Sequence, residues 1–124
     1  MQQIHTENAP KAIGPYSQAI KVGGLVFASG QLPIDMTTGQ FPEGIKEQTR
    51  ASLTNAAAIL KEAGSDLSRV VKTTVFLSDM DNFAAMNEVY AEFFQQPYPA
   101  RSAVAVKTLP KNALVEIECV ATTE

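Results

Sequence analysis

The stretch that decides the fold runs from Ile45 to Leu77 and reads IKEQTRASLTNAAAILKEAGSDLSRVVKTTVFL. In its first part, apolar or small residues recur at steps of three or four, which places them on one face of a helix. These residues are Ile45, Thr49, Leu53, Ala56, Leu60 and Ala63. Gly64 is a natural residue to end this helix, and the β-branched, apolar run Val70–Leu77 predicts a strand after it. We therefore expect a helix over Ile45–Ala63, followed closely by a strand.

The chain after this strand predicts a second helix and two more strands. Asp79 or Asp81 is expected to cap a helix that runs to about Phe94. Pro97-Tyr98-Pro99 stops this helix, because proline cannot continue it. The apolar face of the helix would consist of Phe83, Met86, Val89 or Tyr90, and Phe93. The two strands are predicted over Arg101–Val106 and Leu114–Ala121.

The chain before Ile45 predicts a β-hairpin. Two extended runs, Tyr16–Val22 and Leu25–Ser29, flank Gly23-Gly24, which is a typical hairpin turn. Residues 30–44 indicate a loop, and the first residues, with His5 among them, indicate a frayed start. A hairpin followed by helix, strand, helix and strand predicts an α+β fold, in which two helices pack on one face of a mixed sheet. With 124 residues and no shift in composition, we expect one domain over residues 1–124.

The composition argues against several classes of protein. Ten basic against thirteen acidic residues give a net charge of −3, without the basic stripe that nucleic-acid binding requires. The single cysteine, Cys119, cannot form an internal disulfide, and one histidine cannot build a zinc site with it alone. Apolar runs fall short of the ~20 residues that span a membrane, and Met1–Pro10 lacks the pattern of a secretion signal. We expect a cytoplasmic protein without a metal, a nucleic-acid partner or a membrane partner.

The last predicted strand has one apolar face and one mixed face. Alternate residues from Val115 to Ala121 share the apolar face, which makes Cys119 an inert core thiol. Alternate residues from Leu114 to Val120 combine two apolar side chains with Glu116 and Glu118. Two helices cannot cover both faces of such a sheet. The mixed face is therefore either a subunit interface with a functional pocket or a solvated face, and the pattern favours neither.

Few residues are candidates for chemistry. Arg101 begins a strand after a rigid Pro-Tyr-Pro segment, where its guanidinium would either hold a substrate carboxylate or form a structural ion pair. Glu116 and Glu118 would either position a water and move protons or remain ordinary surface carboxylates. Tyr16 would orient a ligand or simply pack, and Ser29-Gly30 ends a strand where backbone groups often face a site. A phosphate-binding loop and a Ser-His-Asp set are both missing from the sequence.

Several ordered blocks resemble the RidA (YjgF) family, and the resemblance covers essentially the whole chain. The blocks are Asn8–Pro10 (NAP), Ala12–Gln18 (AIGPYSQ), Ser29–Pro33 (SGQLP), Val71–Leu77 (VKTTVFL), Pro99–Ser102 (PARS) and Leu109–Glu118 (LPKNALVEIE). The resemblance implies a 2-iminobutanoate/2-iminopropanoate deaminase. Such proteins detoxify reactive enamines and imines, released by pyridoxal-phosphate-dependent dehydratases, by hydrolysing them to 2-keto acids and ammonia without a cofactor. It also implies a chorismate-mutase-like fold, assembled as a homotrimer with a site at each subunit boundary.

The resemblance also implies roles for the residues that match its motifs. Arg101 corresponds to the arginine that binds the substrate carboxylate, and Glu116 to the glutamate associated with the hydrolytic water. Tyr16 corresponds to a tyrosine of the site, and Ser29-Gly30 to a strand-end pair near the ligand. Asn87 corresponds to a helix residue that supports the site.

The sequence departs from its close relatives at Ala103, where they usually carry a cysteine. Ala103 is expected to share the strand face of Arg101 and line the substrate pocket, while Cys119 is expected to face the other way. This departure leaves open a second function, a protein that senses small 2-keto acids or binds a partner without catalysis. RNA cleavage, which has been attached to relatives, fits the acidic balance and the lone His5 poorly.

Overall fold

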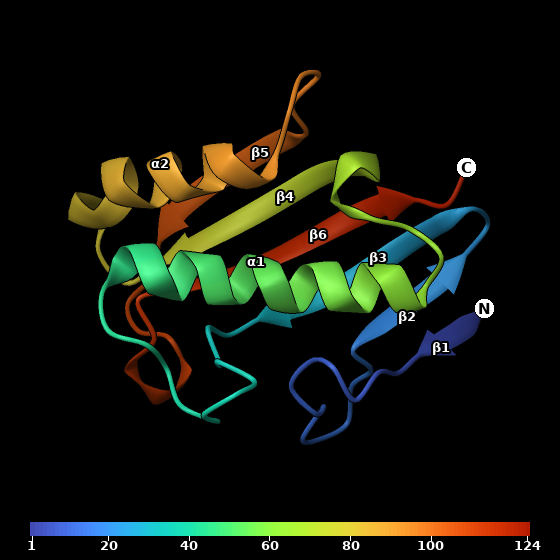
Figure 1. Ribbon diagram of the computed structural model, residues 1–124, viewed down its shortest axis with the longest axis horizontal. Coiled ribbons are helices and arrows are strands. Elements are labelled where there is room, and N and C mark those ends of the chain that lie inside the picture. Colours follow the sequence, from blue (N-terminus) through green and yellow to red (C-terminus); the bar gives the residue numbers. More distant parts are fainter.

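The computed structural model describes residues 1–124 and contains one six-stranded sheet, covered on one face by two helices (Figure 1). The strands are β1 (Gln2–Ile4), β2 (Ala19–Val22), β3 (Leu25–Gln31), β4 (Val70–Leu77), β5 (Ala100–Ala105) and β6 (Val115–Thr122). The helices are α1 (Ile45–Glu62) and α2 (Phe83–Phe93). The strand order is β1-β2-β3-β6-β4-β5, and β4–β5 is the one parallel pair. The predicted α+β class, with a mixed sheet and two helices on one face, is confirmed.

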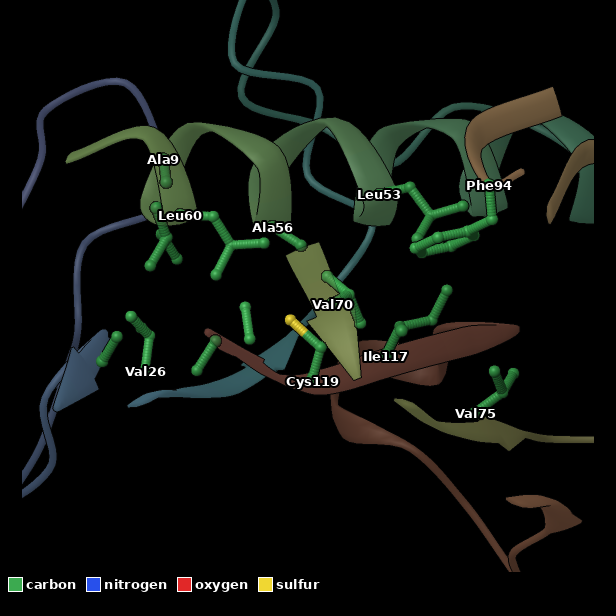
Figure 2. Close-up of a cluster of buried hydrophobic side chains, with 14 of the residues drawn as sticks. Ala9, Val26, Leu53, Ala56, Leu60, Val70, Val75, Phe94, Ile117 and Cys119 are labelled. Carbon is green, nitrogen blue, oxygen red and sulfur yellow. The ribbon is translucent and has the colours of Figure 1, made fainter. Parts of the chain in front are cut away.

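The hydrophobic core lies between the helices and the sheet (Figure 2). Leu53 and Leu60 of α1 point toward the strands, where Ile117 and Cys119 of β6 are buried in the same cluster. Burial of each large aliphatic side chain contributes about 1.5–3 kcal/mol, so this layer dominates the free energy of folding. The prediction that Cys119 is a core thiol is confirmed. Neither helix combines the length and the apolar composition that crossing a bilayer requires.

Two buried amides on α1 hold the loop between β3 and α1. Gln48 Nε2 donates to the Pro42 carbonyl at 3.0 Å, and its Oε1 accepts from the Leu114 N–H at 2.9 Å. Asn55 Nδ2 donates to the Ile34 carbonyl at 2.9 Å. Both side chains are nearly inaccessible to solvent, so these hydrogen bonds satisfy groups that would otherwise be costly to bury. The segment predicted as a loop therefore has a defined path beside the sheet.

The N-terminal segment differs from the prediction. Gln2–Ile4 forms β1, which pairs antiparallel with β2, and Ile4 is buried in the core. The expectation of a frayed start is wrong, because a three-residue strand has too few positions to reveal a period. The predicted strand from Tyr16 begins only at Ala19. The residue before it, Gln18, is buried and uses its side-chain amide to bind the backbone of residues 6–10.

The other predicted elements are confirmed with small shifts at their ends. Asp79 caps a short 3-10 turn, where its carboxylate accepts from the Asp81 N–H at 2.8 Å, and α2 begins after that turn. Strand β3 runs past its predicted end to Gln31. Ser29 and Gly30 therefore lie within the strand, at an irregularity in its pairing with β6, rather than at its end.

The sheet face opposite the helices is uncovered (Figure 1). Phe27 of β3 and Val104 of β5 are 45% and 46% exposed on it, although both side chains are large and apolar. Glu116 and Glu118 of β6 lie on this same face, because Glu116 pairs with Phe76 and Glu118 with Thr74 of β4. The predicted mixture of apolar and charged residues on one face of the last strand is confirmed.

Candidate functional site

The residues predicted for the site lie in two clusters on opposite faces of the sheet. Thr73 of β4 pairs with both Arg101 of β5 and Cys119 of β6, and directly paired residues point to the same face. Cys119 is in the core, so Arg101 lies on the helix side. Glu116 lies on the uncovered side. Within one chain, Arg101 and Glu116 are therefore not brought together.

The Arg101 side chain is held only by uncharged groups. Its Nη1 donates to Asn87 Oδ1 at 2.7 Å. Its Cζ lies 4.7 Å from the centre of the Tyr90 ring and 5.4 Å from that of Phe83, both within range of a cation–π contact. The ion pairs of the chain involve His5, Lys46, Arg50 and Arg69, but not Arg101. The alternative of a structural ion pair for Arg101 is therefore wrong for this chain.

A cavity of about 460 Å³ lies beside this arginine. It is lined by Asn87, Tyr90, Ala91, Tyr98, Pro99 and Arg101. Tyr90 is buried, and its hydroxyl lies 2.8 Å from Thr73 Oγ1. Burial raises the pKa of Tyr90, so the phenol stays neutral next to the guanidinium. The cavity therefore offers one unneutralised cation in a largely uncharged lining.

Sequence reasoning missed the aromatic residues of this cluster. Phe83 and Tyr90 were expected only as core residues of α2, whereas both also face Arg101. Their spacing carried a signal. Phe83, Asn87 and Tyr90 follow one another at steps of four and three, which places them on one side of the helix.

The second cluster surrounds a cavity of about 560 Å³. Its lining includes Tyr16, Ser29, Gly30 and Glu116, which brings together four of the predicted site residues. The Ser29 hydroxyl donates to the Ser17 carbonyl at 2.6 Å. That hydrogen bond ties β3 to the segment that carries Tyr16, whose side chain is 53% exposed beside the cavity.

Glu116 has a perturbed carboxyl group. Burial raises its pKa above the usual 4.5, and the negative charge of Glu118 raises it further. Such a group exchanges a proton at a pH nearer to neutrality than an ordinary glutamate does. Glu118 is exposed and lines a different, smaller hollow of the same face.

Ala103 lies on the expected face of its strand, whereas Cys119 does not lie where it was expected. Ala103 shares the face of Arg101, as predicted, but it packs against the core and is not among the residues that line the arginine cavity. The expectation that Cys119 faces the other way is wrong. Val75 of β4 pairs with both Ala103 and Ile117, so these residues share a face of the sheet. Cys119 lies two residues after Ile117 and therefore points to that same face. Burial raises the pKa of the Cys119 thiol to about 12. No three His, Cys, Asp or Glu side chains gather as metal ligands would.

Comparison with known proteins covers nearly the entire chain. The sequence profile of the family described as Endoribonuclease L-PSP matches residues 6–123. A RutC family protein from Pyrococcus horikoshii is 59% identical over 95% of this chain and 94% of its own length. A 2-iminobutanoate/2-iminopropanoate deaminase from Capra hircus is 50% identical over 95% of this chain and 87% of its own length.

Solved structures give the same result. The crystal structure of RidA from the Antarctic bacterium Psychrobacter sp. is 47% identical, with a TM-score of 0.94 over 98% of this chain and 99% of that one. The structure of TdcF from E. coli with bound serine is 42% identical, with a TM-score of 0.94 over 100% of both chains. The chain belongs to the Endoribonuclease L-PSP family, within which its relatives carry the names RutC and RidA.

Proposed function

We propose that this protein hydrolyses 2-imino acids and their enamine tautomers, such as 2-aminoacrylate/2-iminopropanoate and 2-iminobutanoate, to 2-keto acids and ammonia. The observation that carries the proposal is Arg101, a fixed guanidinium without a carboxylate partner beside a cavity. A carboxylate is the group common to these substrates, and a hydrogen bond to a charged group contributes about 1.5–3 kcal/mol. The name of the goat relative and the serine bound to TdcF support the same substrate class.

The complete site requires a second copy of the chain in this proposal. One cluster carries a cation without a carboxylate, and the other carries Glu116, Tyr16, Ser29 and Gly30 without an arginine. The uncovered sheet face, with exposed Phe27 and Val104, is the surface that another copy would bury. We therefore propose a homotrimer in which the arginine cluster of one subunit meets the Glu116 cluster of its neighbour.

The reaction needs little beyond these groups. Arg101, supported by Asn87, would bind the substrate carboxylate and fix the position of the C=N carbon. Glu116 would accept a proton from the attacking water and return it to the departing nitrogen, with Tyr16 orienting the substrate. Water thus adds to the carbon to give a carbinolamine. The hydroxyl proton of that intermediate then passes to the nitrogen as the C=O bond forms, and the C–N bond breaks to release ammonia. Positioned acid–base groups typically accelerate such steps by about 10²–10⁴-fold.

A coupled assay tests the proposal. The protein is added to a serine or threonine dehydratase reaction, and the appearance of the 2-keto acid is followed. We expect faster release with the wild type, no acceleration with Arg101→Ala, and full acceleration with Arg69→Ala, which removes an arginine outside both clusters. Ala103→Cys, run beside them, shows whether the usual thiol adds to the rate. Light scattering on each variant reports whether the trimer forms.

Each alternative gives a different result in these experiments. Binding of 2-ketobutyrate without any acceleration would favour the ligand-sensing or partner-binding protein, and unchanged activity of Arg101→Ala would overturn the role of Arg101. Cleavage of RNA by a nuclease-free preparation would support the activity after which the family is described. The cytoplasm remains the proposed compartment, and fractionation of cells with an antibody to the protein would test it.

A further inference from the structure

The aromatic ring of Tyr90 lies in an uninterrupted series of contacts from the core to Arg101. Thr73 of β4 is completely buried, and its hydroxyl lies 2.8 Å from the Tyr90 hydroxyl. The Tyr90 ring also packs against Phe94, with ring centres 4.5 Å apart. The guanidinium carbon of Arg101 lies 4.7 Å from the centre of the Tyr90 ring. The Tyr90 ring thus packs against the core on one side and contacts the Arg101 guanidinium on the other side.

The choice of uncharged neighbours matters for what Arg101 can do. An arginine held by a carboxylate is well ordered, but its charge is largely compensated before any ligand arrives. An arginine held by an aromatic face and an amide oxygen is ordered while it keeps its charge and most of its N–H donors. Asn87 accepts from Nη1 alone, so the other N–H groups of the fork remain for a carboxylate.

We infer that Tyr90 is a positioning residue for carboxylate binding: its ring, buried on the core side, holds the Arg101 guanidinium in place without neutralising it. This inference rests on the proposed function only for the identity of the ligand. The order of the Arg101 side chain is a property of the free protein and is measurable without any substrate.

The first experiment is NMR relaxation of the Arg101 Nε–Hε group in the protein without ligand. We expect an order parameter near that of rigid backbone, about 0.85, in the wild type and in Tyr90→Phe, and a value below about 0.6 in Tyr90→Leu. Phe94→Leu is the matched control, because it removes the other ring of the same pair, which does not contact Arg101, and should leave the value high. Tyr90→Met should behave as Tyr90→Leu and serves if that variant does not fold.

The second experiment is a double-mutant cycle on binding of 2-ketobutyrate, followed by calorimetry. Loss of the cation–π contact in Tyr90→Leu should weaken binding by about 5- to 30-fold, whereas Phe94→Leu should change it by less than about twofold. In an Arg101→Met background, Tyr90→Leu should cause no further loss, because its effect passes through the arginine.

Two results would overturn the inference: an unchanged Arg101 order parameter in Tyr90→Leu, or a loss of binding from Tyr90→Leu that persists in the Arg101→Met background. Failure of the proposed function gives a different pattern. In that case the dehydratase assay shows no acceleration, while the NMR experiment still gives a rigid Arg101 that loosens in Tyr90→Leu.

Discussion

The carboxylate of Glu116 occupies the space in which a side chain at Gly30 would begin. A Cβ atom built on Gly30 would lie only 2.9 Å from Cδ of Glu116 and closer still to Oε2. Gly30 does not have the positive φ that favours glycine, so its lack of a side chain serves this close approach. The two residues lie on neighbouring strands, β3 and β6, where their pairing is irregular. Gly30 thus sets the position of the one carboxylate that lines this cavity.

We predict that Gly30→Ala displaces the Glu116 carboxylate and lowers the proposed hydrolytic activity. A displacement of about 1 Å at a reacting group typically costs about 100-fold in rate, and we expect a loss of kcat/KM of that order. The dehydratase assay measures it. In a Glu116→Ala background, Gly30→Ala should have little further effect. A full 100-fold loss in that background would show that Gly30 acts on something other than the glutamate.

The pH dependence of the reaction should follow the raised pKa of Glu116. Only the ionised carboxylate accepts a proton from water, so activity should fall as pH is lowered through that pKa, which lies above 4.5. Glu118→Gln removes the nearby negative charge that contributes to the shift. The acidic limb of the profile of kcat/KM should therefore move to lower pH in Glu118→Gln. A limb that stays in place would assign the titration to another group.

The same pKa makes a prediction about stability. Because the folded-state pKa of Glu116 lies above its unfolded value, the folded protein holds this proton more tightly, and stability is lost as pH rises through the raised pKa. Glu116→Gln, which carries no charge, should therefore unfold at a higher temperature than the wild type at pH 7. The advantage should shrink as pH falls through the raised pKa and should be absent below about 4.5. Glu43→Gln, in an exposed loop, is the control and should show neither effect.

Periodic patterns predicted most of the fold. The spacing of Leu53, Ala56 and Leu60 located α1, and the alternation in Leu114–Ala121 correctly separated the core face of β6 from its mixed face. Strand β1 was missed, because three residues cannot show a period and only its pairing with β2 makes it a strand. The start of β2 was placed too early, because the hydrogen bonds of the Gln18 side chain with Thr6 and Pro10 precede the strand and leave no periodic pattern in the sequence.

The site was predicted as a set of residue types, but not as an arrangement. Sequence gives the alternation within a strand, but not its register against the next one, so it could not place Arg101 and Glu116 on opposite faces of the sheet. For the same reason it placed Cys119 on the wrong side relative to Ala103. The contact between Arg101 and Tyr90 joins strand to helix, and only the packing of the two layers reveals it.

The side-chain amide of Gln18 shapes the wall of the Glu116 cavity. Its Oε1 accepts from the Thr6 N–H at 2.7 Å, and its Nε2 donates to the carbonyls of Thr6 at 3.1 Å and Pro10 at 2.9 Å. Gln18→Glu keeps the acceptor but replaces the donor with an oxygen that faces these carbonyls. A buried polar group left unpaired costs about 1–3 kcal/mol, and several lose their partner here, so we expect a loss of more than about 2 kcal/mol in unfolding free energy.

Urea denaturation measures this loss, with Gln40→Glu as the control, because that residue is exposed and its side chain makes no hydrogen bond. The segment released by Gln18→Glu lines the cavity together with Tyr16. In Gln18→Glu, the amide protons of residues 6–10 should therefore exchange with solvent faster than in the wild type. This increase should be larger than the increase in the central strand β6. If exchange instead rises equally in both, Gln18 stabilises the whole fold and has no special part in building the cavity wall.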